Sequence, residues 1–219
     1  MYLNMGELTG KITAIRPDRG RQKRVKVSLD NKLAFSLDAG VAKEERLQIG
    51  QELSEERINS LVKSDHFTRC LNAAFLFLSY RPRSEGELKE RLQRRGFNGE
   101  NIEKVIAKLK EQKLVDDLAF ARFWKDNRDS FSPRGQRLIK LELKQKGVNA
   151  SIVDEIVDTT DDTENAYNAA MHKARSLKRV DYPTFRRRLG EYLQRRGFDF
   201  ALINRVIERV WQEKVSIAE

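Results

Sequence analysis

The sequence predicts a mainly α protein, an elongated array of three tandem three-helix modules with a small N-terminal β-rich domain. Two observations predict this class. The first fifty residues contain runs that alternate between apolar and polar positions, as strands do. The later residues repeat one helical pattern about every fifty positions, with Gly96, Gly147 and Gly197 in equivalent places. The expected domains are residues 1–52, residues 53–113 (a linking helix and the first module), residues 114–160 and residues 161–219.

The N-terminal domain is expected to contain a hairpin and a third strand. Residues 24–29 and 33–37 alternate on either side of Asp30 and Asn31, which tolerate the positive φ of a tight turn. Residues 7–15 form the expected third strand, and residues 16–24 an exposed basic loop. Because three strands bury little surface alone, we expect a short helix at 38–47 to cover the sheet.

Each module is expected to contain three helices separated by a proline and a glycine. Pro82, Pro133 and Pro183 each stand fourteen residues before the module glycine. Proline cannot continue a helix, so it separates the first helix from the second. Glycine ends the second helix because it adopts the left-handed conformation readily. Apolar residues spaced three and four apart predict the buried faces of the helices.

The first helices of the modules are less regular than the others. We expect them at residues 67–80, from an N-cap near Asp117 onward, and at residues 164–177. Ser54 with the following glutamates predicts the start of the linking helix. The polar, acidic segment 158–164 between the second and third modules is expected to be a flexible joint.

Cations recur on the second helix of each module. The stretch LQRRGF occurs at residues 92–97 and again at 193–198, and the middle copy reads LKQKGV. Cationic faces at one place in successive modules would form a stripe suited to a polyanionic or acidic partner, which arginine can bind with two hydrogen bonds. A solvated face balanced by neighbouring glutamates is the alternative. The candidate partner-binding residues are Arg91, Arg94, Arg95, Arg134, Arg137, Lys140, Lys144, Arg187, Arg188, Arg195 and Arg196.

The composition favours a polyanionic partner and disfavours a membrane protein. Lysine and arginine number 43 against 33 acidic residues, a formal charge of +10 at pH 7. The longest apolar run is too short for a bilayer, which needs about 20 residues. Cys70 is the only cysteine and lies in an apolar run, which predicts a buried, inert thiol. No signal peptide is recognisable, so we expect a cytoplasmic protein.

The sequence gives little support to catalysis. His66 and His172 are far apart, and no group of cysteines or acids at ligand spacing accompanies them. The stretch GELTGK at residues 6–11 differs from a phosphate-binding loop in its glycine spacing and in its last residue. We therefore expect no catalytic residue, no metal and no cofactor.

The middle module resembles the RecX family, whose members regulate the RecA recombinase. The resemblance lies in LVDDLAFARFWKDNR at residues 114–128 and SPRGQRLIKLELKQKGV at 132–148, and it extends over roughly residues 65–214. It implies tandem three-helix repeats and a non-catalytic role in DNA repair, homologous recombination and the SOS response. It also implies that the protein binds the RecA filament on single-stranded DNA, as a monomer in the groove of the filament, and inhibits RecA ATP hydrolysis and strand exchange. The residues at family positions are Asp117, Phe120, Ala121, Arg122, Arg128, Gly135, Arg137, Leu138, Glu142, Leu143 and Gly147.

Two other functions remain open. Basic three-helix modules could bind DNA directly, and such binding would weaken steeply with salt. The array could also be a scaffold for another acidic protein. Binding to DNA with and without the RecA filament, measured across salt concentrations, would separate direct DNA binding from filament binding.

Overall fold

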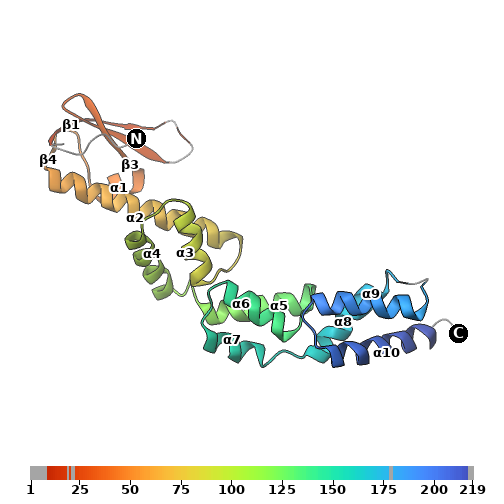
Figure 1. Ribbon diagram of the computed structural model, residues 1–219. Coiled ribbons are helices and arrows are strands. Elements are labelled where there is room, and N and C mark those ends of the chain that lie inside the picture. The colour runs from red at the N-terminus through yellow and green to blue at the C-terminus, as the bar shows by residue number, and fades with distance from the viewer. Residues whose placement is uncertain (1–8, 19, 21–22, 178–179, 217–219) are drawn as a thin grey trace. The chain divides into compact units, whose positions relative to one another are not determined.

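The described part of the chain is mainly helical, as predicted (Figure 1). The computed structural model describes residues 9–18, 20, 23–177 and 180–216. These residues form four strands and ten helices. They divide into two compact units, residues 1–81 with 89–111 and residues 82–88 with 112–219.

The first unit begins with a four-stranded antiparallel sheet. Strands β1 (Gly10–Pro17), β2 (Arg24–Leu29), β3 (Lys32–Asp38) and β4 (Glu52–Leu53) lie in the order β3-β2-β1-β4. The predicted hairpin is confirmed, because Asp30 and Asn31 have φ angles of 47° and 65°. The predicted third strand is also confirmed. It continues to Pro17, while residues 7 and 8 lie outside the described residues.

Two expectations for this region need correction. The basic loop 16–24 is shorter than predicted, since both of its ends are strand residues; residues 19, 21 and 22 within it lie outside the described residues. The expected covering helix exists as α1 (Ala39–Glu44), but it buries only Val41. The sheet core is completed by Ile58 and Leu61 from the next helix, α2. A six-residue helix offers too narrow an apolar face to cover the sheet alone.

Helix α2 (Glu55–Tyr80) is one continuous helix of 26 residues. Ser54 caps it as predicted, accepting the Arg57 N–H at 3.3 Å. The sequence analysis divided this stretch into a linking helix and the first helix of the first module. No proline or glycine interrupts residues 55–80, so nothing breaks the backbone pattern between them. Cys70 is buried in this helix, and burial raises the pKa of its thiol to about 11.

The three-helix repeat is confirmed in the rest of the chain. The first repeat continues with α3 (Glu85–Arg94) and α4 (Gly99–Glu111). The second contains α5 (Asp117–Phe131), α6 (Gln136–Gln145) and α7 (Ala150–Val157), and the third contains α8 (Asp162–Ala174), α9 (Tyr182–Arg195) and α10 (Phe200–Ser216). Gly96, Gly147 and Gly197 have φ angles of 83°, 76° and 85°, so each ends its second helix in the left-handed conformation.

Several helix starts differ from the expectation. Asp116, rather than Asp117, caps α5 by accepting the N–H groups of Leu118 and Ala119. Segment 158–164 is an ordered helix start and not a flexible joint, because Asp161 caps α8 and Thr160 is buried. Helix α9 begins before Pro183, which lies in its first turn. That position suits proline because the first turn does not need its N–H.

Candidate partner-binding surface

The second helix of the second repeat buries one face and exposes cations on another. Ile139 and Leu143 are fully buried against α5 and α7. Arg137, Lys140 and Lys144 are spaced three and four apart, so they share a stripe of α6. Arg137 and Lys144 are exposed, whereas Lys140 pairs with Asp154 of α7, a hydrogen bond that raises the pKa of Lys140.

The second helix of the third repeat is organised in the same way. Phe185, Leu189 and Leu193 are fully buried, while Arg187, Arg188 and Arg195 are exposed. Arg187 also pairs with Glu191 at 3.3 Å. Within the second unit, α6 and α9 lie on one side and α7 and α10 on the other (Figure 1). The exposed cations of these two repeats therefore lie on helices of the same side.

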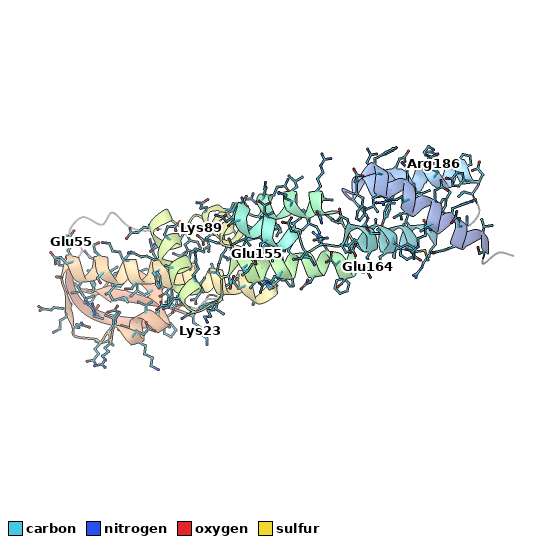
Figure 2. The ribbon with its side chains drawn as sticks, turned by 90° about the horizontal axis from the view of Figure 1, so that it is seen from below. Lys23, Glu55, Lys89, Glu155, Glu164 and Arg186 are labelled. Carbon is cyan, nitrogen blue, oxygen red and sulfur yellow. The ribbon has the colours of Figure 1, made fainter. Side chains whose placement is uncertain are left out.

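One exposed cation of this helix was missed by the sequence analysis. Arg186 precedes Arg187 and reaches out from α9 (Figure 2). It donates to the Asn204 Oδ1 of α10 at 3.5 Å. The run of three arginines at 186–188 was the signal, but only Arg187 and Arg188 were selected from it.

The candidate cations of the first repeat lie around Phe77 and Glu90. The guanidinium groups of Arg91 and Arg95 lie 5.6 Å and 4.6 Å from the centre of the Phe77 ring, a cation–π arrangement. Arg94 is exposed and pairs with Glu90 at 2.5 Å. Arg95 is also exposed, so Arg94 and Arg95 are accessible to a partner.

Arg134 has an internal role. It forms an ion pair with Glu142, which also accepts hydrogen bonds from Trp124 at 2.7 Å and from Arg128 at 2.9 Å. Glu142 is buried, so this carboxylate holds α5 and the start of α6 together. Burial lowers the pKa of Arg134, and the neighbouring cations Arg128 and Arg196 lower it further.

Arg196 also makes contacts within the protein. Its guanidinium donates to the Pro133 carbonyl oxygen at 2.9 Å and to the Ser132 hydroxyl at 3.1 Å, and it lies over the Tyr192 ring at 4.6 Å. These contacts join the third repeat to the second. The sequence could not reveal this, because the partners are more than sixty residues away along the chain.

The contacts of Arg196 belong to a feature that we call the repeat joint, in which the residues after one repeat's proline meet the glycine turn of the next repeat. In the second joint, Gly135 N–H donates to the Arg196 carbonyl at 2.9 Å, and Gln136 N–H donates to the Asp162 carboxylate at 2.8 Å. A Cβ on Gly135 would lie 2.5 Å from the Gly197 carbonyl oxygen. Only glycine permits this approach.

The first joint repeats this arrangement. The Ser84 hydroxyl donates to the Lys146 carbonyl at 2.5 Å, and the Glu85 N–H donates to the Asp117 carboxylate at 2.7 Å. A Cβ on Gly86 would lie 2.9 Å from the Gly147 Cα. Asp117 is therefore an acceptor in the joint. The side chain of Lys146, the residue before Gly147, also takes part in this joint, because its Nζ lies 3.9 Å from a Glu87 carboxylate oxygen.

Two kinds of feature are absent from the described residues. They contain no group of three or more His, Cys, Asp or Glu side chains placed to hold a metal ion. None of their helices has both the length and the apolar character needed to cross a bilayer. The second helices of the second and third repeats expose several cations.

Comparison with known proteins identifies the repeats. Family models described as the first, second and third three-helix domains of RecX match residues 70–109, 116–156 and 160–207. The regulatory protein RecX of Bacillus velezensis is 31% identical over 95% of this chain and 80% of its own length. The regulatory protein RecX of Clostridium perfringens is 29% identical over 92% of this chain and 96% of its own length.

Solved structures agree on the fold. A crystal structure of a regulatory protein RecX has a TM-score of 0.64 at 24% identity, covering 92% of this chain and 100% of its own. The RecX structure from Lactobacillus salivarius has a TM-score of 0.56 and covers 67% of this chain and 97% of its own. The relatives are named regulatory proteins, which implies a non-enzymatic role. Three matching repeats and relatives aligned over nearly the whole chain show that this chain belongs to the RecX family.

Proposed function

We propose that this chain is a non-catalytic regulator that binds the RecA filament on single-stranded DNA and inhibits RecA ATP hydrolysis and strand exchange. Membership of the RecX family is the observation that carries the proposal. The protein acts in the cytoplasm as a monomer that lies in the groove of the filament. It contributes binding energy, and no catalytic group or cofactor takes part.

The exposed cations supply a surface for this role. Arg137 and Lys144 on α6, and Arg187, Arg188 and Arg195 on α9, are accessible. A filament presents repeated subunits around an anionic strand, so tandem basic repeats can bind it at several points. Each contact raises the effective concentration of the next, and weak contacts therefore add up to strong binding. Arg94 and Arg95 offer a further basic surface in the first unit.

Binding of this kind can inhibit without any chemistry. A ligand that prefers one filament state increases the population of that state by its difference in affinity. If the chain prefers a state in which subunits do not hydrolyse ATP or exchange strands, both activities fall. The extent of inhibition should follow the occupancy of the filament.

The direct test is a titration of RecA ATP hydrolysis on single-stranded DNA. The proposal expects the rate to fall as the protein is added and to level off when the filament is saturated. An unchanged rate, under conditions where the protein is folded and the filament is formed, would contradict the proposal.

Direct DNA binding is the second candidate, and the exposed arginines of α9 favour it. The two functions differ in whether the protein binds the RecA filament more tightly than DNA alone. A direct DNA binder would bind DNA equally well without RecA, and the logarithm of its affinity would fall linearly with the logarithm of the salt concentration. A filament regulator should bind the filament more tightly than DNA alone at every salt concentration. Equal affinities would favour the second candidate.

A further inference from the structure

The second and third repeats each receive the segment before them in a repeat joint, whereas in the described residues the sheet precedes the first repeat. Its glycine turn is nevertheless built like the other two. Gly96 has a φ angle of 83°, and a cation, Arg95, stands immediately before it, as Lys146 and Arg196 stand before Gly147 and Gly197. In the two joints, a Cβ on the turn glycine would meet the preceding segment within 3.0 Å. A Cβ on Gly96 would meet no described atom within 4 Å.

In the first repeat, the N-terminal sheet makes part of the contacts that a preceding segment makes in the two repeat joints. The Asp38 N–H at the end of β3 donates to the Asp65 carboxylate in α2 at 2.7 Å. This matches the Glu85–Asp117 and Gln136–Asp162 bonds of the two joints, where a backbone N–H also meets a carboxylate of the next repeat's first helix. Arg24 of β2 completes the contact with an ion pair to Asp65 at 3.1 Å. The sheet thus substitutes for one half of a joint.

The other half is an open groove within the first unit. One cavity of about 490 Å³ lies between the sheet, α2 and the α3–α4 turn. A second cavity of about 280 Å³ adjoins it at Arg69, Arg95 and Phe97 and reaches Gly96. Figure 2 shows Lys23 at the sheet's side of this region. The groove is lined by Lys23, Asn72, Leu76 and Phe97, with Arg69 and Arg95.

The charge of the groove indicates the character of its occupant. Four cations line it, Lys23, Arg24, Arg69 and Arg95, and Arg24 already pairs with Asp65. The one carboxylate among the lining residues, Asp38, accepts the Gly40 N–H at 2.8 Å. In the two joints, the cation before the glycine contacts oxygen atoms of the segment it receives: Glu87 in the first and the Pro133 carbonyl in the second. A segment that carries carboxylates would therefore pair with Arg95.

The backbone geometry favours a peptide over a nucleic acid. In both joints the occupant donates a hydrogen to the carbonyl before the glycine, through the Ser84 hydroxyl or the Gly135 N–H. A phosphodiester has no hydrogen to donate there, whereas an extended peptide has one on almost every residue. We propose that the half-filled joint of the first repeat binds an extended acidic peptide segment of a partner protein. A glycine or serine of that peptide would lie against Gly96.

The probe for this proposal can be taken from the chain itself. Residues 81–87 read RPRSEGE and form the segment that the second repeat receives. A fluorescein-labelled peptide EPESEGE, with glutamate replacing both arginines, keeps the proline and the serine and adds the charge that the groove requires. Its binding to the full chain is measured by fluorescence anisotropy at low salt. The unmodified RPRSEGE peptide and a single-stranded oligothymidylate, both carrying the same fluorescein label, serve as comparisons.

Arg95→Glu should raise the Kd for the acidic peptide by about tenfold, because the substitution reverses the charge beside the glycine. Arg94→Glu is the matched control, since Arg94 is the adjacent exposed arginine, pairs with Glu90 and does not line the groove. Its effect should stay within about twofold. Arg69→Glu should act in the same direction as Arg95→Glu. Unfolding curves establish that each variant is folded.

The location of binding gives an independent readout. On adding the acidic peptide, NMR amide shifts should change at Gly96, Phe97 and Asn98. No saturable binding up to about 1 mM, equal loss in the Arg94 and Arg95 variants, or shifts confined to other regions would each overturn the proposal. Tighter, Arg95-dependent binding of the oligothymidylate would assign the groove to nucleic acid instead. No RecA is present, so these outcomes are independent of the filament-binding function.

Discussion

Helices α6 and α9 hold the same place in successive repeats but begin in different ways. Twelve residues before the turn glycine stands Gly135 in the second repeat and Phe185 in the third. Gly135 belongs to an extended segment whose backbone bonds to the following repeat. Phe185 is buried inside a helix that begins at Tyr182, and both aromatic rings pack against Trp211, at 5.0 Å and 5.2 Å.

The starts of α6 and α9 satisfy their backbone N–H groups in two different ways. An extended segment exposes backbone N–H groups that need acceptors, and the next repeat supplies them. A helix that starts earlier satisfies its own backbone and covers the end of the repeat with aromatic side chains. Helix α9 therefore begins without an extended segment like the one at Gly135. The same difference turns Arg134 inward, toward Glu142, while Arg186, Arg187 and Arg188 stand on an exposed helix surface.

The largest expected effect is on the buried carboxylate of the second repeat. Glu142→Ala leaves Arg128 and Arg134 without their acceptor and should lower the free energy of unfolding by about 3–5 kcal/mol. The third repeat has Tyr192 at this position, so Tyr192→Ala removes ring packing and the cation–π contact with Arg196 and should cost about 1–2 kcal/mol. Urea unfolding measures both. A larger loss for Tyr192→Ala would break the comparison.

The next largest effect concerns the glycine of the second joint. Gly135→Ala places a Cβ 2.5 Å from the Gly197 carbonyl oxygen and should destabilise the chain by about 2–3 kcal/mol. Gly190→Ala in α9 is the control, because its Cβ would meet only Ile207 at an ordinary 3.6 Å. Alanine favours the helix interior, so this variant should gain about 0.5–1 kcal/mol. In thermal and urea unfolding, the change in the free energy of unfolding should have opposite signs in the two variants. A loss of stability in both variants would contradict the account of the joint.

The smallest expected effect is a pH dependence at the same joint. Burial raises the pKa of Asp162, and the hydrogen bond from Gln136 opposes this shift only in part. The folded chain therefore holds this proton more tightly than the unfolded chain, so the Asp162 contribution to stability falls as the pH rises through its folded pKa. Asp162→Asn cannot ionise. Relative to the natural chain, this variant should gain stability between about pH 4 and pH 7, and a relative loss over that range would refute the assignment.

The sequence was sufficient for whatever depends on local chemistry. The turn glycines, the hairpin at Asp30 and Asn31, and the buried helix faces follow from backbone preference and apolar spacing. Contacts between distant segments could not be predicted in this way. The polarity of segment 158–164 suggested flexibility, but its aspartates cap α8 and accept the Gln136 N–H. Arg134 and Arg196 resembled surface cations until their partners were located.

The central proposal is that exposed cations of the second helices, among them Arg188 and Arg195 of α9, contribute to filament binding. Inhibition of RecA ATP hydrolysis tests it, with the double variant Arg188→Glu and Arg195→Glu compared with Arg205→Glu and Arg209→Glu on α10, which change the charge equally on the other side of the repeat (Figure 1). The account predicts that the α9 variant needs about tenfold more protein for half inhibition, and that the α10 variant stays within about twofold of the natural chain. Equal inhibition by both variants would contradict it.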